Sequence, residues 1–237
     1  MKHIPNIITS LNLASGFIAI IFVLNGDREI ACWILIAAMI FDFLDGFASR
    51  LLNAYSDLGK ELDSLADLVS FGVTPGLIIF SILADSSAPW QTNHPGFSYF
   101  LIIAIAALMP VCAGLRLAKF NIDSSQKLIF KGLPTPANAL AVISVVFAAR
   151  YGQIAFIDGL ISSPIAIMIY SLLLSVLMIT RMPLMSLKFP DYKIKNNIHR
   201  YLLVALSIVV IASGGLGGLI FIIPLYILIS VTVALVK

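Results

Sequence analysis

The acidic residues of this sequence are concentrated in one stretch, DFLDGFASRLLNAYSDLGKELDSLAD, at positions 42–67. The chain has 12 acidic residues, and half of them lie here: Asp42, Asp45, Asp57, Glu61, Asp63 and Asp67. Two basic residues, Arg50 and Lys60, lie between them, which is too few to neutralise six acids. Carboxylates held close together repel one another, so the stretch indicates a site that holds cations.

Two pairs of aspartates in this stretch have helical spacing. Asp42 and Asp45 are three positions apart, which places them about 60° apart on one face of a helix. Asp63 and Asp67 are four positions apart and about 40° apart on a second helix. Because the connection between the two helices is short, the two pairs can converge in one cavity.

A cavity lined by carboxylates favours hard divalent ions. Ligand sets made only of oxygen atoms suit Mg²⁺ or Mn²⁺, and the stretch has no His or Cys that would indicate zinc. Two such ions can clamp phosphate oxygens during an in-line displacement, so the pattern is typical of phosphoryl chemistry. Gly46 and Gly59 would let a bulky ligand approach the backbone. The alternatives are a structural cluster and the cation path of a transporter.

The elements that position these residues are transmembrane helices. The chain is 60% hydrophobic and 11% charged, with a mean hydropathy of +1.03, and apolar runs of about 20 residues recur along its 237 residues. We therefore predict an all-α, polytopic helical bundle. Eight spans are predicted, near residues 7–25, 31–51, 64–84, 98–120, 134–150, 160–180, 199–212 and 216–236. Seven spans, with 199–236 folded differently, is the alternative.

The distribution of Lys and Arg predicts the orientation of these spans. With the N-terminus in the cytoplasm, thirteen basic residues fall on the inner side, and only Arg28 and Arg150 fall on the outer side. The acidic stretch then lies at the cytoplasmic ends of the second and third spans. We read the small basic excess as a topology signal and expect no nucleic-acid partner.

The spacing of the acidic stretch also resembles a known family, the CDP-alcohol phosphotransferases. Their motif is D-x2-D-G-x2-A-R-x8-G-x3-D-x3-D, and this chain departs from it at one position, where Ser49 replaces a small alanine. The matching residues are Asp42, Asp45, Gly46, Arg50, Gly59, Asp63 and Asp67. The resemblance covers roughly residues 4–140. Within it, residues 64–76, 114–121 and 130–139 resemble the bacterial branch that uses serine as acceptor.

The resemblance implies a reaction and a set of roles. It implies transfer of a phosphatidyl group from CDP-diacylglycerol to the hydroxyl of L-serine, with release of CMP. Asp67 would be the catalytic base. The metal ligands, for two Mg²⁺ or Mn²⁺ ions, would be Asp42, Asp45, Asp63 and Asp67. The nucleotide or lipid donor would be bound by Gly46, Ser49, Arg50 and Gly59, with Asn6 and Thr9 near the start of the first span.

The acceptor pocket is expected near the cytoplasmic ends of the fourth and fifth predicted spans. The candidate residues for an anionic group are Arg116, Lys119, Asn121 and Lys131. Arg116 is favoured, because its planar guanidinium suits a carboxylate or a phosphate. The same residues could instead contact lipid headgroups.

The expected domain organisation is a single membrane-embedded domain, 1–237. It has a catalytic core of about 1–180 and additional spans at about 198–237. The family resemblance implies a homodimer among membrane lipids, in the cell membrane of a prokaryote, with the active site facing the cytoplasm.

Other functions are open from the sequence. The same chemistry could use glycerol phosphate or inositol phosphate as acceptor, or an ether lipid as donor. A divalent-cation transporter and a scaffold protein are alternatives of other classes.

Overall fold

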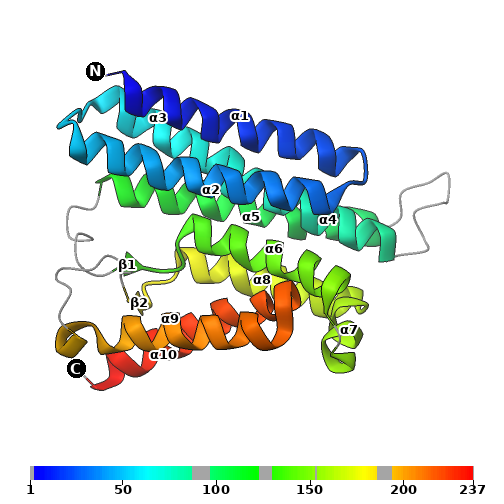
Figure 1. Cartoon of the computed structure of the whole chain (residues 1–237). Coiled ribbons are helices and arrows are strands. Elements are labelled where there is room, and N and C mark those ends of the chain that lie inside the picture. Colours follow the sequence, from blue (N-terminus) through cyan, green and yellow to red (C-terminus); the bar gives the residue numbers. More distant parts are fainter. Residues whose placement is uncertain (1–2, 87–96, 123–129, 153, 186–193, 237) are drawn as a thin grey trace.

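The computed structural model of the chain describes residues 3–86, 97–122, 130–152, 154–185 and 194–236. The predicted all-α class is confirmed (Figure 1). The α-helices are α1 (Ile4–Leu24), α2 (Arg28–Leu51), α3 (Asp57–Leu68), α4 (Thr74–Ser86), α5 (Phe97–Ile122), α6 (Thr135–Tyr151), α7 (Ala155–Ile161), α8 (Pro164–Ile179), α9 (Ile194–Gly214) and α10 (Ile222–Val236).

In the part of the chain that the structure describes, two helices of other types join α-helices end to end. The π-helix η1 (Val69–Val73) joins α3 to α4, and the 3₁₀-helix η4 (Gly215–Phe221) joins α9 to α10. At η4 the chain turns back, so that α9 and α10 lie side by side (Figure 1). The predicted spans 199–212 and 216–236 are separated at the start of η4, but the sequence did not predict the π-helix.

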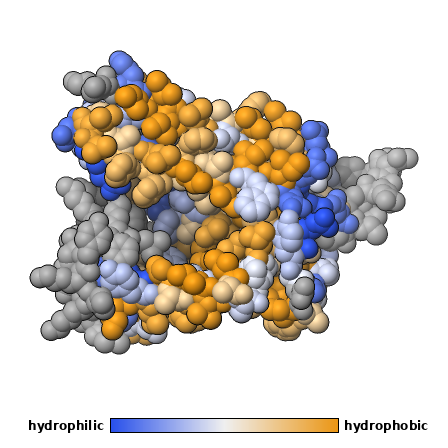
Figure 2. Space-filling model, in the orientation of Figure 1, coloured by the Kyte–Doolittle hydropathy of each residue, from blue (hydrophilic) through white to orange (hydrophobic). Residues whose placement is uncertain are grey.

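The helices are suited to a membrane. Within the described residues, five helical runs are long and apolar enough to cross it, or six if the bent pair α7 and α8 is one span. Large apolar side chains cover much of the outer surface, as a bilayer requires (Figure 2). The eight predicted spans remain a prediction, because α6 has 17 residues and 197–235 counts as one run.

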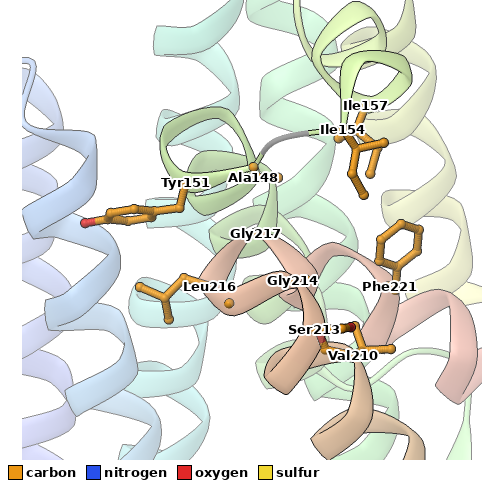
Figure 3. A pocket seen from close by; sticks show the side chains of 13 residues that line it. Ala148, Tyr151, Ile154, Ile157, Val210, Ser213, Gly214, Leu216, Gly217 and Phe221 are labelled. Carbon is orange, nitrogen blue, oxygen red and sulfur yellow. The ribbon is translucent and has the colours of Figure 1, made fainter.

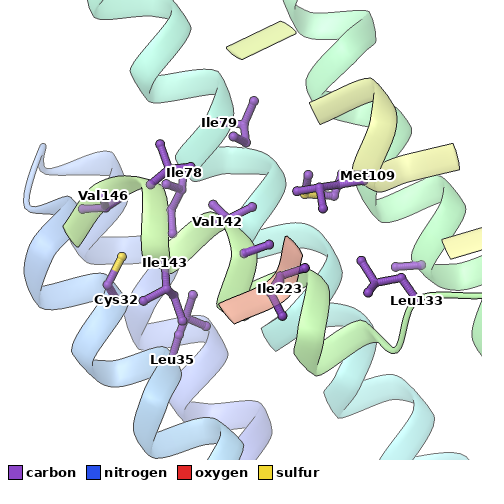
Figure 4. Close-up of a cluster of buried hydrophobic side chains, with 14 of the residues drawn as sticks. Cys32, Leu35, Ile78, Ile79, Met109, Leu133, Val142, Ile143, Val146 and Ile223 are labelled. Atoms are coloured by element: carbon purple, nitrogen blue, oxygen red, sulfur yellow. The ribbon is translucent and has the colours of Figure 1, made fainter. Parts of the chain in front are cut away.

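Helix α6 lies at the centre of the bundle and carries much of its core. Most of its side chains are buried, and it contacts α2, η1, α4 and η4. Val142 and Ile143 of α6 lie beside Leu35 of α2 and Ile78 of α4 (Figure 4). Any residue on the buried faces of α6 is therefore held firmly against α2, η1 and α4.

The link between α2 and α3 explains why α3 begins earlier than the predicted third span at 64–84. After α2, Asn53 adopts a left-handed backbone conformation with φ 46° and turns the chain. Ser56 then caps α3, because its side chain accepts a hydrogen bond from the Gly59 N–H. This short turn sets α3 antiparallel to α2, which brings the two aspartate pairs to the same end of the bundle.

A short antiparallel ribbon fixes the start of α6. Strands β1 (Phe130–Lys131) and β2 (Pro183–Leu184) pair, and the Gly132 N–H then donates to the Met182 carbonyl at 2.9 Å. The sequence did not predict this ribbon, because two-residue strands show no alternating pattern.

Helix α10 holds the ribbon from the other side. The Tyr226 hydroxyl donates to the Met185 carbonyl at 2.9 Å, and the Met185 N–H donates to Ser230 Oγ at 3.2 Å. Both side chains come from one face of α10 and are almost fully buried. The C-terminal hairpin thereby supports the loop that leads into α6.

We predict that Gly132→Ala destabilises the protein by about 1–3 kcal/mol. Gly132 has φ +80°, and a Cβ there would lie 2.6 Å from the Met178 carbonyl oxygen. The control is Gly159→Ala in α7, where no atom lies within 4 Å of the added carbon. Thermal unfolding in detergent should show a lower midpoint for Gly132→Ala alone. Equal midpoints for the two variants would contradict the account of this turn.

Candidate active site

Three carboxylates from two helices meet near one end of the bundle. Asp42 of α2 and the α3 residues Asp63 and Asp67 each present one oxygen atom, and these atoms lie within 4.8 Å of one another. The helical spacing on each side of the Asn53 turn produces this meeting. Three of the four aspartates that were predicted to converge therefore lie close together.

The fourth residue, Asp45, is tied to α1. Its Oδ2 accepts a hydrogen bond from Thr9 Oγ1 at 2.6 Å, and its side chain is buried. The same Thr9 hydroxyl lies 3.0 Å from the Pro5 carbonyl. Asp45 thus stands beside the group of three carboxylates, and its hydrogen bond fixes α1 against α2.

A cavity of about 500 Å³ opens beside these carboxylates. Its walls include Asp42, Asp45 and Asp63. All six residues predicted to bind the donor also line it: Asn6, Thr9, Gly46, Ser49, Arg50 and Gly59. Asp67 is not among the described lining residues and is 9% exposed, so it lies deeper in the protein.

The two glycines of this cavity have different surroundings. No atom lies within 4 Å of a Cβ built on Gly46, so its backbone faces open space. A Cβ on Gly59 would lie 2.9 Å from Asn6 Oδ1 and 3.0 Å from Ser56 Oγ. Gly59 therefore allows α1 to approach the start of α3. Arg50 Nε donates to the Gly46 carbonyl at 2.9 Å, which holds the guanidinium at the cavity wall.

Asp67 is linked to a buried arginine through α6. The Thr135 hydroxyl lies 3.4 Å from Asp67 Oδ2, and Arg116 Nη1 lies 3.5 Å from that hydroxyl. Arg116 is 8% exposed, and its guanidinium carbon lies 6.0 Å from the centre of the Phe120 ring. Arg116, predicted for the acceptor pocket, is thus placed beside the carboxylates. Thr135 was missed, because nothing in the sequence marks a contact across 68 positions.

Of the other predicted acceptor residues, neither Lys119 nor Asn121 joins Arg116 beside Asp67 in the described contacts. Lys119 is exposed. Asn121 joins α5 to α3, since its Nδ2 donates to Ser64 Oγ at 2.9 Å and its carbonyl accepts from Lys60 Nζ at 2.9 Å. Lys131 lies in β1, and its side chain is outside the described residues. Of the three predicted residues whose side chains are described, only Arg116 reaches the group around Asp67.

The donor set fits a hard divalent cation. Oδ1 of Asp63 and Oδ1 of Asp67 are buried and have no hydrogen-bond partner among the described residues. Buried carboxylate oxygens are costly without a donor or a cation. A cation such as Mg²⁺ or Mn²⁺ binds oxygen ligands of this kind, so the unpaired oxygens agree with the metal site predicted from the sequence.

A second cavity, of about 580 Å³, lies at the opposite end of α6 (Figures 1 and 3). Ala148, Ile154, Val210 and Phe221 line it together with glycines around η4. Among the described lining residues there is no carboxylate, imidazole or thiol. The described lining of this cavity therefore offers no metal ligand of the kind that the aspartates provide.

Comparisons with known proteins agree with this site. A CDP-diacylglycerol–serine O-phosphatidyltransferase of Bacillus subtilis is 35% identical over 193 residues, which cover 81% of this chain and 93% of that protein. The enzyme of the same name from Helicobacter pylori is 32% identical over 205 residues, covering 84% and 77%. An archaetidylserine synthase of Methanothermobacter thermautotrophicus is 31% identical over 153 residues, covering 64% and 60%.

The family comparison covers all the residues of the candidate site. The sequence model of the CDP-alcohol phosphatidyltransferases matches residues 2–185, from before α1 to the end of the ribbon. Helices α9 and α10 lie outside that match. The chain belongs to the CDP-alcohol phosphatidyltransferase family.

Proposed function

We propose that this chain transfers a phosphatidyl group from CDP-diacylglycerol to L-serine, giving phosphatidylserine and CMP. The observation that carries the proposal is the meeting of Asp42, Asp63 and Asp67 beside a cavity lined by the donor residues of the family motif. The names of the Bacillus and Helicobacter relatives state the same reaction.

Asp67 is proposed as the base. A serine hydroxyl is a weak nucleophile at neutral pH, so a positioned carboxylate that takes its proton speeds the attack. Oδ2 of Asp67 is approached by Thr135, whereas Oδ1 has no partner among the described residues. We therefore assign the proton to Oδ1. The serine oxygen forms its bond to the β-phosphorus, the bond from that phosphorus to the bridging oxygen breaks, and CMP leaves.

The remaining aspartates would bind metal. One or two Mg²⁺ or Mn²⁺ ions held by Asp42, Asp63 and Asp67, with Asp45 as a further ligand, would neutralise the charge of the donor diphosphate. The cytidine and its phosphates would fill the cavity between α1 and α2. Gly46 leaves room there, and Arg50 supplies a positive charge at the wall.

Arg116 is proposed to bind the carboxylate of serine. It is buried, its Nε has no partner among the described residues, and Thr135 joins it to Asp67. A carboxylate held at this guanidinium would place the serine hydroxyl near Asp67. Lys119, Asn121 and Lys131 would lie at the outer part of the acceptor path.

The membrane arrangement is also proposed. We infer eight spans, with the N-terminus and the active site on the cytoplasmic side of a prokaryotic cell membrane. The bias of thirteen inner basic residues against two outer ones supports this orientation, and the α9–α10 hairpin supports two C-terminal spans. The chain would act as one catalytic domain within a homodimer.

Serine is favoured over other acceptors. The Bacillus enzyme and the archaeal synthase differ in the lipid part of their names, but both names contain serine. The relatives therefore support the acceptor more strongly than they support the lipid chains of the donor.

The reaction predicts release of CMP that depends on serine. Purified protein in detergent, with CDP-diacylglycerol and Mn²⁺, should release CMP with L-serine and not with glycerol 3-phosphate or inositol phosphate. Asp67→Asn should lower the rate about 10²-fold or more, because the base is lost. Asp158→Asn, at an exposed site in α7, is the matched control and should keep the rate. Turnover only with another acceptor would overturn the choice of serine.

The role of Arg116 predicts a change in serine affinity. Arg116→Lys keeps the charge but loses the planar pair of donors, so the KM for serine should rise about tenfold with little change in the KM for CDP-diacylglycerol. Arg150→Lys, at an exposed arginine in the last turn of α6 that pairs with Glu29, should leave both constants unchanged. If the KM for the donor rises instead, Arg116 binds the lipid donor and not serine.

A further inference from the structure

The π-helix η1 begins two residues after Asp67, inside the helical run that carries the site. In an α-helix, the Phe71 carbonyl would accept the N–H of residue 75. Residue 75 is a proline and has no N–H. Inside a membrane an unpaired carbonyl is costly, because water is not there to replace the missing donor.

A side chain of α6 takes the place of the missing donor. Asn138 Nδ2 donates to the Phe71 carbonyl at 3.1 Å, and neither residue has any exposed surface. Thr135, which reaches Asp67, lies one turn earlier on the same face of α6. One face of α6 therefore contacts both the Asp67 carboxylate and the backbone that follows it.

Helix α1 holds the other side of η1. Ser70 Oγ donates to the Asn12 carbonyl at 3.0 Å, and Thr74 Oγ1 lies 3.3 Å from the Gly16 carbonyl. The π-helix is thus fixed between α1 and α6 by side chains bonded to main-chain carbonyls. Single-turn π-helices inside α-helical runs are frequent at functional sites.

We propose that Asn138 is a positioning residue for Asp67, because its amide replaces the backbone donor that Pro75 lacks and so fixes the helix turn that directs Asp67 toward Asp42 and Asp63. This inference rests on the proposed function in one respect, because it takes from it the role of Asp67 in catalysis and metal binding. Without the hydrogen bond from Asn138, the turn can relax, and the Asp67 carboxylate moves out of line with the other two.

The first test is Asn138→Val, which removes the donor and keeps most of the side-chain volume. We expect kcat for CMP release to fall about 10- to 100-fold, since small displacements of reacting groups cost this much. At saturating Mn²⁺ the KM for CDP-diacylglycerol should stay within about twofold, because no residue of α6 is among the described lining of the donor cavity. Ser175→Ala is the control: it removes a buried hydroxyl that donates to the Ser171 carbonyl within α8, and it should change neither constant.

The second test restores a donor from the backbone. In Asn138→Val combined with Pro75→Ala, residue 75 has an N–H that can reach the Phe71 carbonyl. The kcat of this double variant should therefore be at least about threefold higher than that of Asn138→Val alone. A merely structural contribution of Asn138 would not be replaced in this way. An unchanged kcat in Asn138→Val, or no recovery in the double variant, would overturn the proposal.

A Mn²⁺ titration followed by electron paramagnetic resonance separates this proposal from the proposed function. Asn138→Val should bind Mn²⁺ several-fold more weakly than the wild-type chain, whichever acceptor is used. If the wild-type chain shows no turnover with serine but Asn138→Val still weakens Mn²⁺ binding, the proposed function fails and the positioning role stands. Equal Mn²⁺ binding by the two proteins would contradict the positioning role.

Discussion

The main constraint on this structure is the mutual repulsion of carboxylates that its helices hold close together. The packing of the other helices must overcome that repulsion. Asp42, Asp63 and Asp67 lie close together and are partly or fully buried, and two of their oxygens have no hydrogen-bond partner among the described residues. When its members are ionised, such a group is stabilised by cations between them. The packing around it must therefore resist the separation that repulsion favours, and the proposed divalent ion would complete it.

Three features resist that separation. The turn at Asn53 and the Ser56 cap hold α3 against α2, while the bond from Thr9 to Asp45 holds α1 against the same helix. Helix α6 closes the third side, with Thr135 on the Asp67 carboxylate. The ribbon and the α9–α10 hairpin fix the start of α6, so the part of the chain outside the family match also supports the site.

Much of the site was predictable because its spacing is local. Residues three or four positions apart share a helix face, and this rule alone places Asp42 near Asp45 and Asp63 near Asp67. The buried partners were not predictable in this way. Thr135 contacts Asp67, 68 positions away, and Asn138 contacts Phe71, 67 positions away. Contacts over such distances produce no periodic pattern in a single sequence. The π-helix within the predicted third span was also not predictable, because the apolar pattern of that span continues through residues 69–73.

The central claim is that these carboxylates hold divalent metal beside the donor cavity. The most direct measurement is anomalous X-ray diffraction at the manganese edge, on crystals of the protein grown with Mn²⁺. The account predicts at least one strong anomalous peak within coordination distance of Asp42, Asp63 and Asp67. A fully occupied Mn²⁺ site elsewhere, with no peak between these three carboxylates, would contradict it.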